Sequence, residues 1–186
     1  MHKSKMIPMV LSSFFLALAI VLPFITGQLQ QLGSMLLPMH LPIMLCGFIC
    51  GSRYGLVVGM IAPLLRSSLF SMPVFYPNAL AMAIELATYG FCCGFFFEQS
   101  KWKCIRRVYV SLFSAMILGR ISWGLAMSVF MFGSFTWQIF MTQAFLQAIP
   151  GILLQLVFIP AIMLVLHKTH LMPSMQKNAI HPCDMR

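Results

Sequence analysis

Acidic residues are scarce in this chain, which has three Asp and Glu among 186 residues, against twelve Lys and Arg. The sequence contains no paired-carboxylate site, and the GxSxG, HExxH and Walker lysine motifs are missing as well. Because no nucleophile or metal-binding set accompanies the few acids, we do not expect an enzyme. The missing phosphate-binding loop also excludes ATP hydrolysis by the chain itself.

The six cysteines lack the paired spacing of a metal site, and most lie in apolar runs, where Cys acts as a small hydrophobe. The sequence therefore implies neither disulfides nor a bound metal, and it indicates no cofactor. The 17 methionines are spread over nearly every apolar segment, which indicates adaptable packing.

Charge of either sign is also rare, since 8% of the residues are charged while 60% are hydrophobic, with a mean hydropathy of +0.91. This composition predicts a single helical bundle that spans a bilayer. A net charge of +9 in a soluble domain would suggest nucleic acid. Here the positive residues cluster beside apolar segments, so they indicate anchoring to anionic membrane lipid and no nucleic-acid partner.

Six apolar segments are of roughly the length that a tilted helix needs to cross a bilayer, although the segment over residues 40–52 is short. We therefore expect an all-α integral membrane protein, with one six-helix domain over residues 1–170 and a flexible cytoplasmic tail over 171–186. The predicted spans are 8–25, 40–52, 54–71, 78–97, 107–132 and 137–167.

The basic residues are distributed unevenly between the two ends of these spans. Ten of the twelve Lys and Arg lie at the termini or in alternate loops, whereas loops 26–39, 71–77 and 133–136 contain no charge. Placing the basic ends in the cytoplasm puts both termini inside and leaves a long external first loop. The external loops are rich in Gly, Pro, Gln, Ser and aromatic residues, which suits a binding rim.

Gly47, Gly51, Gly55 and Gly59 recur at four-residue spacing across the second and third spans. Small residues at this spacing let neighbouring helices approach closely in a membrane. Close helix packing explains these glycines without a functional role.

Three ionisable residues, Arg66, Glu85 and Arg120, lie inside apolar segments, where a charge is costly. Counted along their helices, all three fall in the middle and outer part of the bundle. In one interpretation Glu85 pairs with one arginine and the group is structural. In the other, the second arginine remains in formal excess and holds an anionic substrate group such as a carboxylate.

Aromatic and amide side chains surround these charges in the predicted helices. Tyr89 follows Glu85 by one turn and Trp123 follows Arg120 by three residues, so both are expected at a small-molecule pocket. The last span carries Gln143, Gln147, Gly151 and Gln155 on one face, where amides either bridge helices or contact a ligand. The candidate substrate-binding residues are Arg66, Glu85, Tyr89, Arg120, Trp123, Gln143, Gln147 and His40.

The order of these features resembles the substrate-binding S component of energy-coupling factor (ECF) transporters, over about residues 8–168. The likeness rests on a first helix rich in small residues, a long external first loop, and a run of short motifs. These are His40-Leu-Pro42, Gly47, Gly51, Tyr54-Gly55 and Gly59.

The resemblance implies a subunit in a bacterial plasma membrane that captures a vitamin-like substrate from outside, between the first loop and the last three helices. It implies partners as well: a transmembrane coupling subunit and two ATPases that energise uptake while the binding subunit topples in the membrane. The family docks through an alanine-x-x-x-alanine pattern on the first helix, to which Ser13 and Ala17 correspond here.

The two-arginine, one-glutamate balance favours an anionic vitamin such as pantothenate, with folate or another carboxylate next. Riboflavin-like ligands fit if the arginines are structural. A metal-transporting branch of the family begins Met-His, as Met1-His2 does here, but Lys3 and Lys5 hold this end in the cytoplasm. Two alternatives stay open, an autonomous proton-coupled secondary transporter in which Glu85 titrates, and a non-transporting membrane scaffold.

Overall fold

The computed structural model describes residues 3–25, 38–99, 105–131, 142 and 149–168, and its regular elements over these ranges are all helices. The all-helical class predicted from composition is confirmed for this part of the chain. The elements are α1 (Lys3–Ile25), α3 (His40–Cys50), α4 (Ser52–Phe70), η1 (Phe75–Ala79), α5 (Leu80–Glu98), α6 (Ile105–Phe130) and α8 (Ile149–Lys168).

Over the described residues, the six α-helices correspond one to one to the six predicted spans. Four of them are long and apolar enough to cross a membrane: α1, α5 together with η1, α6 and α8. The second span, α3, is short as expected, with 11 residues, whereas α4 has 19 residues but is not among the four. The first part of the sixth predicted span, the first external loop and the tail lie outside the described residues.

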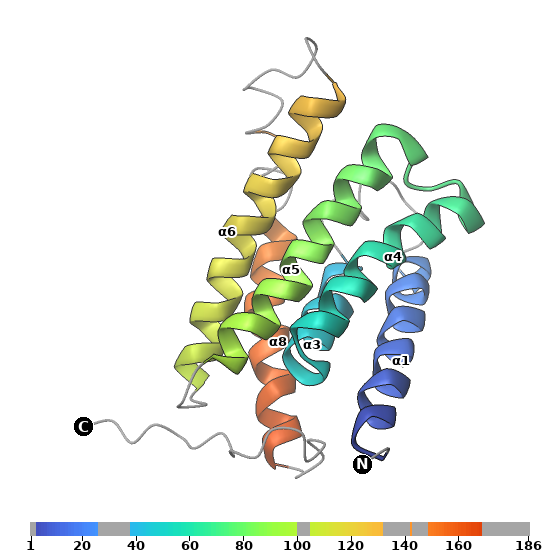
Figure 1. Ribbon diagram of the computed structural model, residues 1–186. Helices are drawn as coiled ribbons and strands as arrows, with labels where there is room; N and C mark the ends of the chain where they lie inside the picture. The colour runs from blue at the N-terminus through green and yellow to red at the C-terminus, as the bar shows by residue number, and fades with distance from the viewer. Residues whose placement is uncertain (1–2, 26–37, 100–104, 132–141, 143–148, 169–186) are drawn as a thin grey trace.

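Successive helices run in opposite directions, so that their ends form two groups (Figure 1). The start of α1, the end of α5, the start of α6 and the end of α8 lie together at one end of the bundle, at the bottom of the view. Lys3, Lys5, Arg106 and Arg107 belong to these helix ends. The basic residues of the described helix ends therefore gather at one end of the molecule, as the uneven charge distribution predicted.

The turn between α3 and α4 consists of one residue and lies at the same end. Gly51 has a φ of 103°, a conformation that favours glycine because it has no side chain. The next residue, Ser52, donates its backbone N–H to Glu98 Oε1 at 3.2 Å and its hydroxyl to Oε2 at 3.1 Å. The Glu98 carboxylate of α5 thus caps the start of α4 and fixes these two helices to each other.

Glycines bring α3, α4 and α5 into backbone contact. A Cβ atom added to Gly47 or Gly55 would collide with the carbonyl oxygen of Gly90, and one added to Gly59 would collide with that of Leu86. The close approach predicted from the spacing of Gly47, Gly55 and Gly59 is confirmed. Gly90 is the complementary residue on α5.

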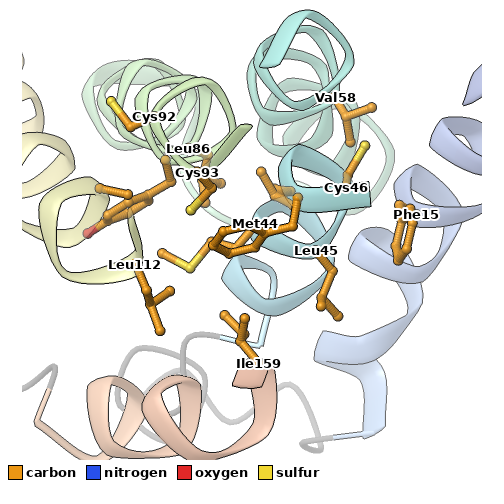
Figure 2. Close-up of a cluster of buried hydrophobic side chains, with 14 of the residues drawn as sticks. Phe15, Met44, Leu45, Cys46, Val58, Leu86, Cys92, Cys93, Leu112 and Ile159 are labelled. Carbon is orange, nitrogen blue, oxygen red and sulfur yellow. The ribbon is translucent and has the colours of Figure 1, made fainter. Parts of the chain in front are cut away.

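The helix α3 is the centre of the hydrophobic core, with nine of its eleven residues buried. Figure 2 shows Met44, Leu45 and Cys46 of α3 surrounded by side chains from the other long helices. These include Phe15 of α1, Val58 of α4, Leu86 of α5, Leu112 of α6 and Ile159 of α8. Because protein and not lipid surrounds α3, this helix does not need the length of a full membrane span.

Substitution of Gly90 by Ala should destabilise the bundle, because the added methyl group meets the backbone of Gly55. We expect a loss of about 1–3 kcal/mol, the usual cost of overpacking, measured as a lower unfolding temperature in detergent. The control is Phe91→Leu at the neighbouring, 38% exposed position, which should change little. An unchanged unfolding temperature for Gly90→Ala would contradict the proposed contact.

Candidate substrate-binding site

The carboxylate of Glu85 lies at the centre of a buried polar cluster between α5 and α6. The residue is 2% exposed, and its Oε1 atom lies 3.1 Å from Arg120 Nη1. The Tyr89 hydroxyl donates a hydrogen bond to the same oxygen at 3.1 Å. Glu85 therefore pairs with Arg120, and Tyr89, one helical turn further along α5, adds a second donor as its spacing predicted.

His40, the first residue of the predicted second span and one of the candidate residues, belongs to the same cluster. It is the first residue of α3 and is 1% exposed, with Nε2 3.8 Å from Glu85 Oε1 and its ring 5.2 Å from that of Tyr89. The 3.8 Å separation suits a charge interaction but is too long for a hydrogen bond. Within the described part of the chain, neither ring nitrogen has a hydrogen-bond partner.

Gly119 of α6 makes room for Tyr89, and we did not anticipate this residue from the sequence. A Cβ atom at position 119 would lie 2.5–2.7 Å from three atoms of the Tyr89 ring. A larger residue there would displace the ring whose hydroxyl holds Glu85. The one sequence feature that could have pointed to Gly119 is its place directly before Arg120, an arginine inside an apolar segment.

Arg66 lies apart from the pair. Gly55 of α4 lies against Gly90 of α5, and Gly59 lies against Leu86. Because the two helices run in opposite directions, Glu85 is level with about residue 60 of α4. Arg66 follows six residues later, about 9 Å further along the helix at about 1.5 Å per residue. The ion pairs found among the described residues do not include Arg66, and its buried Nε has no hydrogen-bond partner there.

The other candidates differ in what the structure says of them. Trp123 lies in a small buried cluster with Ala81, Ala126 and Met127, about one turn beyond Arg120. Gln143 and Gln147 lie outside the described residues. Gln155 of α8, which we did not include among the candidates, is 1% exposed and its Nε2 lacks a partner in the described part of the chain.

The two candidate docking residues lie on an exposed face of α1. Ser13 and Ala17 are both exposed, and the Ser13 hydroxyl donates within its own helix to Met9 O at 3.1 Å. The neighbouring Val10 and Phe14 are 69% and 59% exposed. An apolar face with two small residues at its centre is therefore open on this side of the bundle.

Taken together, these features define a multi-pass membrane protein with an ion pair buried between two of its helices. The family model "ECF transporter, substrate-specific component" matches residues 8–168. The chain therefore belongs to this family and is a substrate-specific subunit of an ECF transporter. Searches of curated proteins and of solved structures found no match.

Substitution of Arg120 by Met should destabilise the protein by about 3–5 kcal/mol, because it leaves the Glu85 carboxylate buried without its counter-charge. Adding Glu85→Gln removes that charge and retains an acceptor for Tyr89, so the double variant should recover at least about 1 kcal/mol. Unfolding in detergent micelles measures both effects. Losses that simply add in the double variant would show that the two side chains are not coupled.

Proposed function

We propose that this subunit binds an anionic, water-soluble vitamin-like molecule, such as pantothenate, from outside the cell. It then passes the molecule inward when a transmembrane coupling subunit and two ATPases supply energy, in a bacterial plasma membrane. The basic end of the bundle faces the cytoplasm in this proposal, as the positive-inside rule requires. His40, Glu85, Tyr89 and Arg120 form the base of the site, and Arg66 lies nearer its external end.

The observation that carries this proposal is the charge balance of the buried Glu85 and Arg120 and the partly buried Arg66. Glu85 neutralises Arg120, whereas Arg66 has no ion-pair partner among the described residues. The Nε atoms of both arginines are buried without a hydrogen-bond partner in this part of the chain. A guanidinium so placed favours a carboxylate, because attraction between charges is stronger where water is excluded.

Energy must come from partners in this proposal, because the chain has no Walker lysine motif. The exposed face of α1 supports such a partnership, since Ala17 and Ser13 allow another helix to approach closely. Bulky exposed side chains cover the outer faces of other helices, for example Phe113 and Leu125 on α6. The small-residue face of α1 is therefore our proposed contact for the coupling subunit.

Native mass spectrometry of the detergent-purified protein, followed by release of any bound molecule, should detect one small acid per chain. The double variant Glu85→Gln/Arg120→Met should remain folded and lose this ligand, because it lacks the guanidinium at the base of the site. The matched control is Arg53→Met, which removes an exposed arginine at the basic end and should keep the ligand. A ligand-free wild-type protein that moves solute into liposomes without ATPases would instead identify an autonomous carrier.

Substitution of Ala17 by Leu should weaken assembly with the coupling subunit at least fivefold in co-purification, because it fills the gap between the two helices. Ligand binding should not change, since this residue lies on the outer surface of α1. Val21→Leu, at another exposed position of the same helix, is the control and should assemble normally. Equal co-purification of both variants would place the contact elsewhere.

A further inference from the structure

Buried polar atoms without hydrogen-bond partners are unevenly distributed in the bundle. Within the described residues, such side-chain atoms belong to His40, Arg66, Arg120 and Gln155. Three of these residues are more than nine-tenths buried, with exposures of 1% for His40, 8% for Arg120 and 1% for Gln155. Buried polar groups normally have partners, so each exception calls for an explanation.

Gln155 can be placed relative to the others through the packing of α8 against α3 and α6. Ile159 of α8 shares a buried cluster with Leu45 of α3 and Leu112 of α6 (Figure 2). Gln155 precedes Ile159 by one turn, about 6 Å closer to the end of the bundle opposite the basic end. The first turn of α3, which begins at His40, lies one turn from Leu45 toward that same end of the bundle.

Arg120 lies on α6 two turns beyond Leu112, about 12 Å toward that same end of the bundle. Side chains in a helix lean toward its N-terminus. Since α6 and α8 run in opposite directions, the Arg120 side chain leans toward the basic end and that of Gln155 leans away from it. Both residues therefore lie on the side of Leu112 and Ile159 that faces away from the basic end, as does the first turn of α3.

The unpartnered groups on this side are mainly donors. Arg120 Nε and Gln155 Nε2 carry only N–H groups, and a neutral His40 ring offers one donor and one acceptor. Glu85 already accepts from Arg120 and Tyr89 through one oxygen. A set of buried donors that lacks acceptors is complementary to a molecule that brings oxygen acceptors.

We propose that Gln155 is a specificity-determining residue of the substrate site, whose amide N–H donates to an uncharged carbonyl oxygen of the substrate. This inference rests on the proposed function. The carbonyl oxygen lies near the base of the site, deeper in the bundle than the acidic group, which Arg66 attracts nearer the external end. The substrate class is then an organic acid that also carries an amide or a similar neutral carbonyl, and not a simple fatty or hydroxy acid.

The first test needs no ligand and compares Gln155→Met with the wild type after bound molecules have been washed out, as verified by native mass spectrometry. Met has a similar shape but no donor, so it removes an unsatisfied group, and the unfolding temperature in detergent should stay equal or rise. Met163→Leu, two turns along the same buried face, is the packing control. A fall of more than about 3 °C for Gln155→Met alone would show a structural amide and overturn the proposal.

The second test measures binding of pantothenate, an acid with an amide carbonyl, and of 6-hydroxyhexanoate, an acid without one. The wild type should bind pantothenate at least tenfold more tightly, and Gln155→Met should remove this preference while leaving the affinity for 6-hydroxyhexanoate unchanged. A preference that survives in Gln155→Met overturns the role of Gln155. If the wild type binds neither acid, pantothenate is excluded as the substrate and the unfolding measurement decides alone: a fall for Gln155→Met overturns the role of Gln155, and an equal or higher unfolding temperature supports it.

Discussion

The neutralisation of one carboxylate in a medium that excludes water is the constraint on which this structure depends. Glu85 cannot remain ionised between membrane helices unless counter-charge and donors reach it, and Arg120 and Tyr89 provide both at 3.1 Å. Because these groups come from α5 and α6, the pair fixes the separation and the register of the two helices. Gly119 is required as well, since only glycine leaves space for the Tyr89 ring.

The short helix α3 follows from the same constraint. Its first residue, His40, lies beside Glu85 inside the bundle, so the helix begins in the interior and not at the end of the bundle. Backbone groups at a helix start need shielding from lipid. The surrounding helices provide that shielding, and the glycine contacts of Gly47 and Gly55 with Gly90 let α4 and α5 pack tightly around α3. Close packing and a polar interior thus depend on each other here.

Composition and spacing were sufficient to predict the helical class, the six segments and the glycine contacts, because each of these is a property of one chain segment. The pairing of Glu85 with an arginine was also predicted. The sequence did not show that this arginine is Arg120 and not Arg66. The distance of each arginine from the start of its helix is compatible with a pair to Glu85, and only the register between the helices decides between them. His40 and Gln155 were harder still, because burial without a partner arises only when several helices pack together.

Unpaired donors at the base of the proposed binding site carry an energetic consequence for the whole subunit. Without a ligand, His40, Arg120 and Gln155 hold polar atoms in a buried region with no partner among the described residues, which lowers the stability of the bundle. A ligand that supplies acceptors both binds and stabilises the packed arrangement, by mass action on the folded state. Proteins often retain such locally unfavourable groups where function requires them. In this bundle His40 and Arg120 lie 3.8 and 3.1 Å from Glu85, the one buried carboxylate of the described helices, so under the proposed function ligand occupancy and helix packing are coupled at the same place.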